Sequence, residues 1–318
     1  MKKSSSRREF LRVSSLGALG AIVLTQNACR NAGKPAGKTK EASNIIDPAT
    51  VGVGLQLYTI RDAMAADVPG SLKQVADAGY KYLELANYAD GKFYGMEPAD
   101  FKKLANDLGM EVLSSHSGVE ATGITLENAQ KMAEDHAKLG VKYCIQPWIV
   151  EEARSTLASY KKMASDWNQV GAIMKDKGIQ FGYHNHNFEF ATVEGQVPYF
   201  DVMMAELDKD LVTMEIDLFW TTKAGQNPID IIKKYPGRFQ IYHMKDMYTK
   251  KDPYYTTVGE DDFAPVGDGI INFKDILAVK DIAGMKYMVV EQDMWKTGNS
   301  MFEAINRSIT NIRTKILV

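Results

Sequence analysis

The stretch Ile179-Gln180-Phe181-Gly182-Tyr183-His184-Asn185-His186 is an apolar run that ends in two imidazoles, and Glu189 follows closely behind it. In an ideal strand the side chains at i and i+2 share one face, so His184 and His186 can point into the same pocket. The chain has only 5 histidines, and two of them stand here with one residue between them. A polar surface loop would explain this pair taken alone. Similar residues at the ends of later strands favour a functional site.

Around this stretch, short apolar runs alternate with longer helical patterns about eight times. The expected strands are Val51–Tyr58, Tyr80–Ala86, Met110–Ser115, Val141–Gln146, Ile179–Tyr183, Leu211–Ile216, Phe239–Met244 and Tyr287–Val290. Glycines such as Gly79, Gly140 and Gly178 end several of the intervening helices. This alternation is typical of parallel βα units. Eight units in this length predict a closed (βα)8 TIM barrel rather than an open doubly wound sheet.

The open-sheet alternative would need a glycine-rich phosphate-binding turn after the first strand. Gly52-Val53-Gly54 lies inside the first expected strand and not after it, so we interpret these glycines as packing positions.

Residues 1–32 have the pattern of an export signal. Ser6-Arg7-Arg8-Glu9-Phe10-Leu11-Arg12 matches a twin-arginine motif, and the apolar run Leu16–Leu24 follows it. That run is too short to cross a bilayer as a permanent helix. Ala28-Cys29 suggests lipoprotein processing with acylation of Cys29, and cleavage near Ala28 to release a soluble protein is the alternative.

Residues 33–48 are rich in small and charged residues and are expected to form a flexible tether, with the catalytic barrel domain over residues 49–318. We therefore expect a periplasmic protein that is exported by the twin-arginine route and is either free or lipid-anchored through Cys29. The other cysteine, Cys144, lies in an apolar run and is expected to be a small buried side chain. An internal disulfide is not expected.

Composition argues against a nucleic-acid partner. The formal net charge is -2, and no basic block follows the leader. Phosphate contacts need clustered Lys and Arg, so binding to DNA or RNA is disfavoured. With 45% hydrophobic and 25% charged residues, the chain resembles an ordinary soluble globular protein.

In a barrel of this kind the catalytic residues lie at the carboxyl ends of the strands. The last four expected strands end at or near His184, Asp217, His243 and Glu291. Two nitrogens and two carboxylates suit Mn, Zn, Co or Fe better than Ca, and Mg is also compatible. We predict that these four residues bind one divalent metal ion with open positions for substrate oxygens. Lys245 would stabilise an enediolate formed beside the ion.

Other strand ends supply candidate substrate contacts. These are Tyr58, Glu84, His116, Gln146, Trp148 and Trp220. A single polar residue at a strand end is more often a loop contact or a cap, and aromatic residues are common core filler. The set as a whole favours a sugar-binding mouth.

Several short motifs together resemble those of a known family. They are Leu55-Gln56-Leu57-Tyr58, Tyr82-Leu83-Glu84-Leu85, Tyr183-His184-Asn185-His186, Ile216-Asp217-Leu218-Phe219-Trp220, His243-Met244-Lys245-Asp246 and Val289-Val290-Glu291. In order and spacing they resemble the sugar phosphate isomerase/epimerase family of xylose isomerase-like TIM barrels. The resemblance implies one divalent metal and a sugar-like substrate, with Asp217, His243 and Glu291 at the family's ligand positions.

The fifth strand departs from that family pattern. Many members carry a glutamate there, which acts as ligand and as proton-transfer base opposite the glutamate of the eighth strand. This chain has His184 at that position. The proton-transfer groups are therefore sought among Glu291, Glu189 and His186, and a neutral imidazole suits general-base work near neutral pH.

The leading hypothesis is a metal-dependent isomerase/epimerase or a lyase/dehydratase. It would act on the keto or aldehyde form of a sugar or glycoside by removing a proton next to a metal-polarised carbonyl. Export disfavours a phosphorylated substrate. The alternative is a non-catalytic periplasmic sugar-binding lipoprotein on the same barrel. A base-excision endonuclease needs a basic face and more histidines than this chain has.

Overall fold

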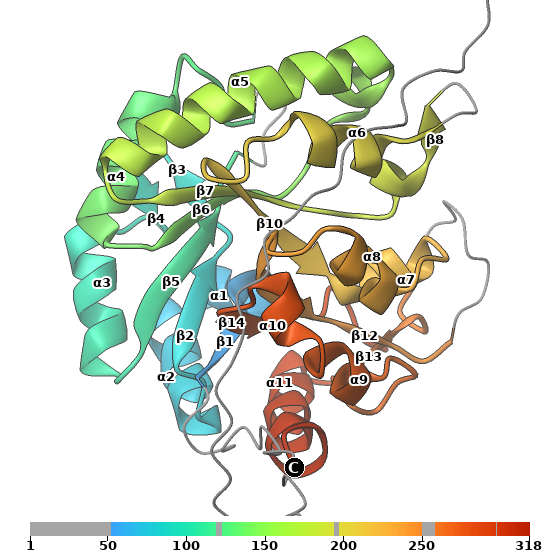
Figure 1. The fold of residues 1–318 in the computed structure, drawn as a ribbon. Coiled ribbons are helices and arrows are strands. Elements are labelled where there is room, and N and C mark those ends of the chain that lie inside the picture. The colour runs from blue at the N-terminus through green and yellow to red at the C-terminus, as the bar shows by residue number, and fades with distance from the viewer. Residues whose placement is uncertain (1–51, 119–122, 194–196, 250–257, 297) are drawn as a thin grey trace, which may run out of the picture. The chain divides into compact units, whose positions relative to one another are not determined.

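The computed structural model describes residues 52–118, 123–193, 197–249, 258–296 and 298–318 (Figure 1). The expected export signal at 1–32, Cys29 and the tether at 33–48 lie outside these residues. Within the described ranges, no helix combines the length and the apolar character needed to cross a membrane.

Eight parallel strands close into a barrel, which confirms the predicted fold. They are β1 Val53–Gln56, β2 Tyr82–Leu85, β5 Glu111–His116, β6 Tyr143–Gln146, β7 Gln180–His184, β10 Val212–Asp217, β11 Phe239–Met244 and β14 Tyr287–Val290. Each strand pairs with the next one in this series, and β14 returns to β1 with Val53 opposite Met288. The carboxyl ends of all eight strands therefore meet at one mouth of the barrel.

Helices surround the strands on the outside (Figure 1). They are α1 Arg61–Ala66, α2 Val68–Ala78, α3 Pro98–Asp107, α4 Ala129–Leu139, α5 Leu157–Asp176, α6 Tyr199–Glu206, α7 Leu218–Lys223, α8 Pro228–Lys234, α9 Phe273–Leu277, α10 Lys280–Ala283 and α11 Met301–Asn311. Local sequence sets their ends. The Asp67 side chain caps the start of α2, and Gly79 ends this helix with a φ of 95°, which glycine adopts without steric cost.

Short elements lie in several loops that follow the barrel strands, and one more follows α11. The two-stranded ribbons are β3 Tyr88–Ala89 with β4 Lys92–Phe93, β8 Thr192–Val193 with β9 Val197–Pro198, and β12 Asp246–Met247 with β13 Phe263–Ala264. The short helical turns are η1 Leu57–Ile60, η2 Glu151–Arg154, η3 Phe188–Phe190 and the π-turn η4 Ile312–Ile316.

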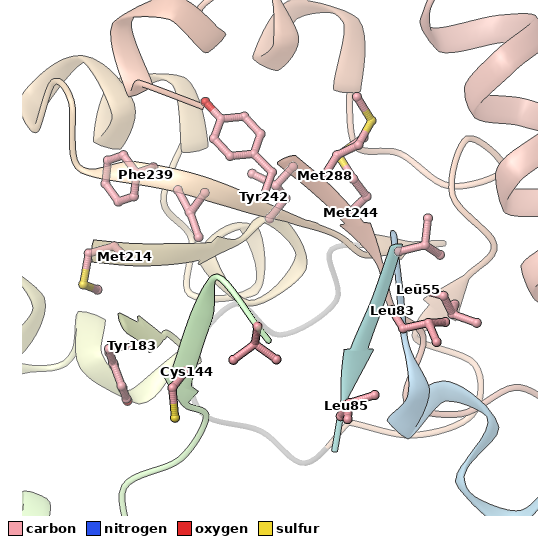
Figure 2. Packing of buried hydrophobic residues seen from close by; sticks show 14 of the residues in the cluster. Leu55, Leu83, Leu85, Cys144, Tyr183, Met214, Phe239, Tyr242, Met244 and Met288 are labelled. Carbon is pink, nitrogen blue, oxygen red and sulfur yellow. The ribbon is translucent and has the colours of Figure 1, made fainter. Parts of the chain in front are cut away.

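The main hydrophobic core lies between the strands and the helices. Figure 2 shows part of it, with Leu55, Cys144 and Met214 among the buried side chains. Cys144 is a free, buried thiol, as expected. Because side chains alternate along a strand, the residues next to these point into the barrel.

A second, smaller apolar cluster occupies positions that alternate with this core. It comprises Leu113, Tyr143, Ile145, Ile241 and Val289. Ile241 precedes His243 by two residues, and Val289 precedes Glu291 by two, so each pair shares one side of its strand. The barrel interior is therefore apolar towards the amino ends of the strands and polar towards their carboxyl ends. The polar layer at the carboxyl ends carries the candidate site.

Candidate metal centre

Four side chains at the mouth of the barrel converge on one point. His184, Asp217, His243 and Glu291, here called the outer set, are all buried, and each offers one ligand atom within 4.8 Å of the others. These are the four residues predicted to bind the metal ion. Nε2 of His184 lies 3.6 Å from Oδ2 of Asp217, and Nδ1 of His243 lies 3.1 Å from Oε2 of Glu291.

Strand register brings the outer set together. Asp217 pairs with His243 across β10 and β11, and Val290, which precedes Glu291, pairs with Met244 across β11 and β14. The set therefore comes from four neighbouring strands of the barrel, β7, β10, β11 and β14, at their carboxyl ends.

Asp217 directs one carboxylate oxygen into the set. Its Oδ1 accepts the backbone N–H of Trp220 at 2.7 Å and so caps α7. Its Oδ2 is buried and accepts no hydrogen bond, and the nearest cation is Nζ of Lys245 at 3.2 Å. Since Lys245 is shared with other carboxylates, a buried oxygen without a hydrogen bond here is costly, and a cation in the set would satisfy it. The two nitrogen and two oxygen donors also suit a divalent transition metal, so these residues fit such an ion.

A second group of side chains lies directly beneath. Glu215, together with His116, His184 and His243, forms what is here called the inner set, whose ligand atoms also lie within 4.8 Å of one another. Oε2 of Glu215 is 2.6 Å from Nε2 of His116 and 3.0 Å from Nδ1 of His184. Its Oε1 is buried without a hydrogen-bond partner.

Sequence reasoning missed Glu215. The signal was available, because Thr213, Glu215 and Asp217 alternate with apolar residues along β10 and therefore share one face. Glu215 was not predicted because it lies two residues before the end of β10, and only residues at strand ends were considered.

Glu84, predicted as a substrate contact, is fully buried and does not line the mouth cavity described below. Its Oε1 lies 2.6 Å from Nε2 of His243 and accepts a hydrogen bond from Nε2 of Gln56 at 2.9 Å. Its Oε2 accepts one from the Ser114 hydroxyl at 2.5 Å. The Glu84 carboxylate is thus occupied by protein groups.

Lys245 lies among three carboxylates at the mouth. Its Nζ is 2.6 Å from Oε2 of Glu291, 3.0 Å from Oδ1 of Asp293 and 3.2 Å from Oδ2 of Asp217. Burial disfavours the ammonium, but these carboxylates outweigh it and hold the pKa of Lys245 well above its usual value. Lys245 is therefore a fixed positive charge.

The imidazoles fall into two electrostatic classes. Burial opposes a charge on His116, but Glu84 and Glu215 prevail and raise its pKa to about 9. For His184, burial and the neighbouring His243 push the pKa well below the ordinary value. Burial and Lys245 do the same for His186, which is therefore neutral near pH 7.

A cavity of about 400 Å³ opens above the outer set. The predicted site residues that line it are Tyr58, His116, Trp148, His184, His186, Lys245 and Glu291. Arg61 and Asp293 also line it and were not predicted as site residues. Tyr58 and Trp148 are 44% and 39% exposed, which leaves both rings accessible to a ligand at the rim.

His186 points into this cavity from the loop after β7. Its Nδ1 is buried and has no hydrogen-bond partner. Its ring packs against the aromatic rings of Trp148 at 4.8 Å and Trp220 at 5.2 Å between centroids. Trp220 is itself buried and does not line the cavity.

Glu189 is fully buried and does not line the cavity. Its carboxylate accepts hydrogen bonds from the Tyr183 hydroxyl and, at 3.0 Å, from the backbone N–H of His186. Burial raises the pKa of Glu189 to about 7. The geometry makes Glu189 the support of the loop that carries His186.

Gln146 is occupied by loop contacts. Its Oε1 accepts the backbone N–H of Ile124 at 2.7 Å, and its Nε2 donates to the carbonyl oxygens of Gly118 and Trp148, both at 2.7 Å. It lines a neighbouring cavity of about 330 Å³ and not the one above the outer set.

Comparisons with known proteins agree with the fold. Residues 72–304 match the family described as xylose isomerase-like TIM barrel. Inosose dehydratase of Clostridium perfringens is 25% identical over 251 residues, which cover 70% of this chain and 81% of that protein. The crystal structure of a sugar phosphate isomerase/epimerase from Parabacteroides distasonis is 27% identical, with a TM-score of 0.71 over 87% of this chain and 97% of that one. The zinc-bound IolI protein has the same fold at 19% identity and a TM-score of 0.65, covering 83% of this chain and 98% of that one.

Proposed function

Since the chain belongs to the xylose isomerase-like TIM-barrel family, we propose that it is a divalent-metal-dependent enzyme that removes a proton next to the carbonyl of a sugar or cyclitol. The observation that carries this proposal is the outer set, where four buried ligand atoms converge below an open cavity. Within that set Oδ2 of Asp217 accepts no hydrogen bond and has only the shared Lys245 ammonium at 3.2 Å, which supports a bound cation. The relatives named inosose dehydratase and sugar phosphate isomerase/epimerase support the substrate class.

The residues that would hold the ion are His184, Asp217, His243 and Glu291. When bound, a divalent ion polarises a carbonyl or two adjacent oxygens and makes the neighbouring C–H more acidic. The cavity walls would hold the sugar ring between Tyr58 and Trp148, the two exposed aromatic side chains at its rim.

His186 is the proposed proton acceptor. It lines the cavity, and its Nδ1 has no other partner. Because its pKa is held well below the ordinary value, the ring is neutral and able to accept a proton at pH 7. Glu189 holds the backbone N–H of His186 and so fixes the position of the ring.

Lys245 supplies positive charge at the same wall. Its ammonium would stabilise the oxyanion that develops as the proton leaves. Three carboxylates hold Nζ in place before substrate arrives, so little reorganisation is needed.

Among the reactions of this class we favour elimination by a dehydratase or lyase. Glu291 is engaged by Lys245 at 2.6 Å and by His243 at 3.1 Å, which leaves His186 as the unengaged base facing the cavity. One base suffices for proton removal followed by loss of a β-leaving group. Epimerisation would use a second group to return the proton to the opposite face.

The test is solvent exchange with the full-length, zinc-loaded protein. Keto sugars, inososes and 3-keto-glycosides are incubated with it in D2O and followed by proton NMR. We expect loss of the C–H signal next to the carbonyl, followed by an unsaturated product. Zinc binding with neither exchange nor product across the panel would instead support a non-catalytic sugar-binding protein.

We also propose that residues 1–32 direct twin-arginine export, which would place the enzyme where unphosphorylated sugars occur. Replacing the pair by Arg7→Lys and Arg8→Lys should retain the protein in the cytoplasm. Membrane fractionation with Cys29→Ala then separates a lipid-anchored protein from a free one. Export of the double variant at the wild-type level would contradict the proposal.

A further inference from the structure

We propose that Glu215 and Glu84 are positioning residues that fix the rings of His184 and His243, so that a metal ion binds in the outer set and not in the inner set. The inference rests on the proposed function, because it requires that the protein binds a divalent ion. It concerns which nitrogen of each histidine takes the ion.

A neutral imidazole has one N–H and one lone pair, and the hydrogen bond of one nitrogen decides which nitrogen can bind a metal. In His184, Nδ1 lies 3.0 Å from Oε2 of Glu215. Because the carboxylate accepts, Nδ1 carries the proton. The lone pair is then on Nε2, which lies 3.6 Å from Oδ2 of Asp217 in the outer set.

His243 uses the opposite nitrogens. Its Nε2 lies 2.6 Å from Oε1 of Glu84 and 3.2 Å from Oε2 of Glu215, so Nε2 carries the proton. Nδ1 also faces a carboxylate, at 3.1 Å from Oε2 of Glu291, but Glu291 is itself a member of the outer set. When an ion in the outer set binds Glu291, the two carboxylates beside Nε2 keep the proton on Nε2, and the lone pair is on Nδ1. With the ion bound, both rings therefore offer their lone pairs to the same side.

His116 joins the two supporting carboxylates. Its Nε2 lies 2.6 Å from Oε2 of Glu215 and 3.1 Å from Oε1 of Glu84. Gln56 and Ser114 hold Glu84 from neighbouring strands. The two carboxylates are thus held in place by their own hydrogen-bond partners. A carboxylate can orient a ligand histidine only if its own position is fixed in this way.

An ion in the inner set would require the opposite arrangement. It would have to bind Nδ1 of His184 and Nε2 of His243, the nitrogens that now face carboxylates. Two ions at once would require both rings to be deprotonated on both nitrogens. The unpartnered Oε1 of Glu215 is the feature that favours an inner ion, but Oε2 is the oxygen that faces the three rings.

The first test reads the tautomers directly. The full-length protein is labelled with ¹⁵N-histidine and loaded with zinc, and two-bond ¹H–¹⁵N correlations are recorded. With 5 histidines in the chain, the rings can be assigned by single substitutions. We expect His184 to be protonated on Nδ1 and zinc-bound through Nε2, and His243 to show the reverse. The opposite pattern in either ring would overturn the proposal.

The second test measures zinc affinity by competition with a chelator. Removing a carboxylate that supports a ligand histidine typically costs about 10–100-fold in metal affinity. We expect a loss of this size for Glu215→Leu and a smaller one for Glu215→Gln, whose amide oxygen can still accept one ring N–H. Glu111→Gln is the control, since Glu111 is half-exposed at the start of β5 and contacts Lys142.

Each outcome has a distinct meaning. If Asp217→Asn loses zinc while both Glu215 variants bind as tightly as wild type, the positioning role is wrong and the metal site stands. If the wild-type protein binds no zinc, the proposed function fails and the inference fails with it. If Glu215→Leu does not fold, the tautomers of the wild-type protein still decide.

Discussion

Glu215 of β10 is the register partner of His184 of β7, and Oε2 of this glutamate lies 3.0 Å from Nδ1 of that histidine. Asp217, two residues further along β10 and on the same face, lies 3.6 Å from the other ring nitrogen. One strand thus places a carboxylate beside each nitrogen of a single imidazole. This relationship separates a supporting layer from a ligand layer inside the barrel.

The ligand role of Asp217 predicts the effect of Asp217→Asn. The variant keeps an oxygen to cap α7, so the fold should survive, but it loses the charge that faces the outer set. We expect zinc affinity to fall by at least about 100-fold, more than for a supporting residue, with turnover lost in parallel. Asp107→Asn is the matched control, because Asp107 pairs with Lys103 on the surface. Zinc affinity within threefold of wild type would rule Asp217 out as a ligand.

The base role of His186 predicts a loss of turnover without a loss of metal. For His186→Ala we expect kcat to fall by about 10²–10⁴-fold, the usual contribution of a general base. Zinc content, measured by atomic emission, should remain at the wild-type value.

Glu189→Gln provides the comparison for His186. The amide oxygen can still accept the backbone N–H of His186, so we expect less than about a tenfold loss in kcat. If Glu189→Gln loses as much as His186→Ala, Glu189 is the proton acceptor and His186 is not.

Lys245 should contribute most to the stability of the protein when no metal is bound. Lys245→Met leaves the buried carboxylates of Asp217 and Glu291 and the partly buried one of Asp293 without their ammonium partner. Removing one partner from a buried group of charges lowers the free energy of unfolding by roughly 3–5 kcal/mol. Bound zinc should restore part of that stability, because its charge compensates the carboxylates. We therefore expect the zinc-induced rise in Tm to exceed that of wild type.

The matched control for Lys245 is Lys209→Met, because Lys209 pairs with Asp210 at the surface. An equal zinc-induced rise in Tm for Lys245→Met and wild type would show that the ammonium does not interact with the ion-binding carboxylates.

The raised pKa of His116 predicts how the stability of the metal-free protein depends on pH. Its pKa rises from 6.5 to about 9 on folding, so its contribution is complete below pH 6.5 and is lost as pH rises through 9. Between pH 7 and 9 this amounts to about 2 kcal/mol of unfolding free energy. Urea unfolding at pH 7 and pH 9 measures this loss. The unfolding free energy of His116→Gln should decrease by about 2 kcal/mol less than that of wild type between these pH values. The same decrease in variant and wild type would contradict this assignment.

Much of the site follows from local sequence. Alternating apolar runs and helices indicate the barrel, and in a barrel the strand ends meet at one mouth. His184, Asp217, His243 and Glu291 stand at those ends and were identified for that reason.

Contacts across the barrel could not be predicted in this way. Whether Glu84 faces substrate or His243 depends on the stagger between strands, which no local pattern encodes. Gln146 stands at a strand end like the ligands, yet its amide binds the loop residues Gly118 and Ile124. Glu189 turns back to its own loop because the η3 turn places it beside the backbone N–H of His186.

Anomalous scattering at the zinc edge from crystals of the zinc-loaded, full-length protein tests the central claim most directly. The account predicts one strong peak at the barrel mouth, about 2.0–2.2 Å from Nε2 of His184, Nδ1 of His243 and one carboxylate oxygen each of Asp217 and Glu291. A peak beside Nδ1 of His184 and Oε2 of Glu215, or no peak within the barrel, would contradict it.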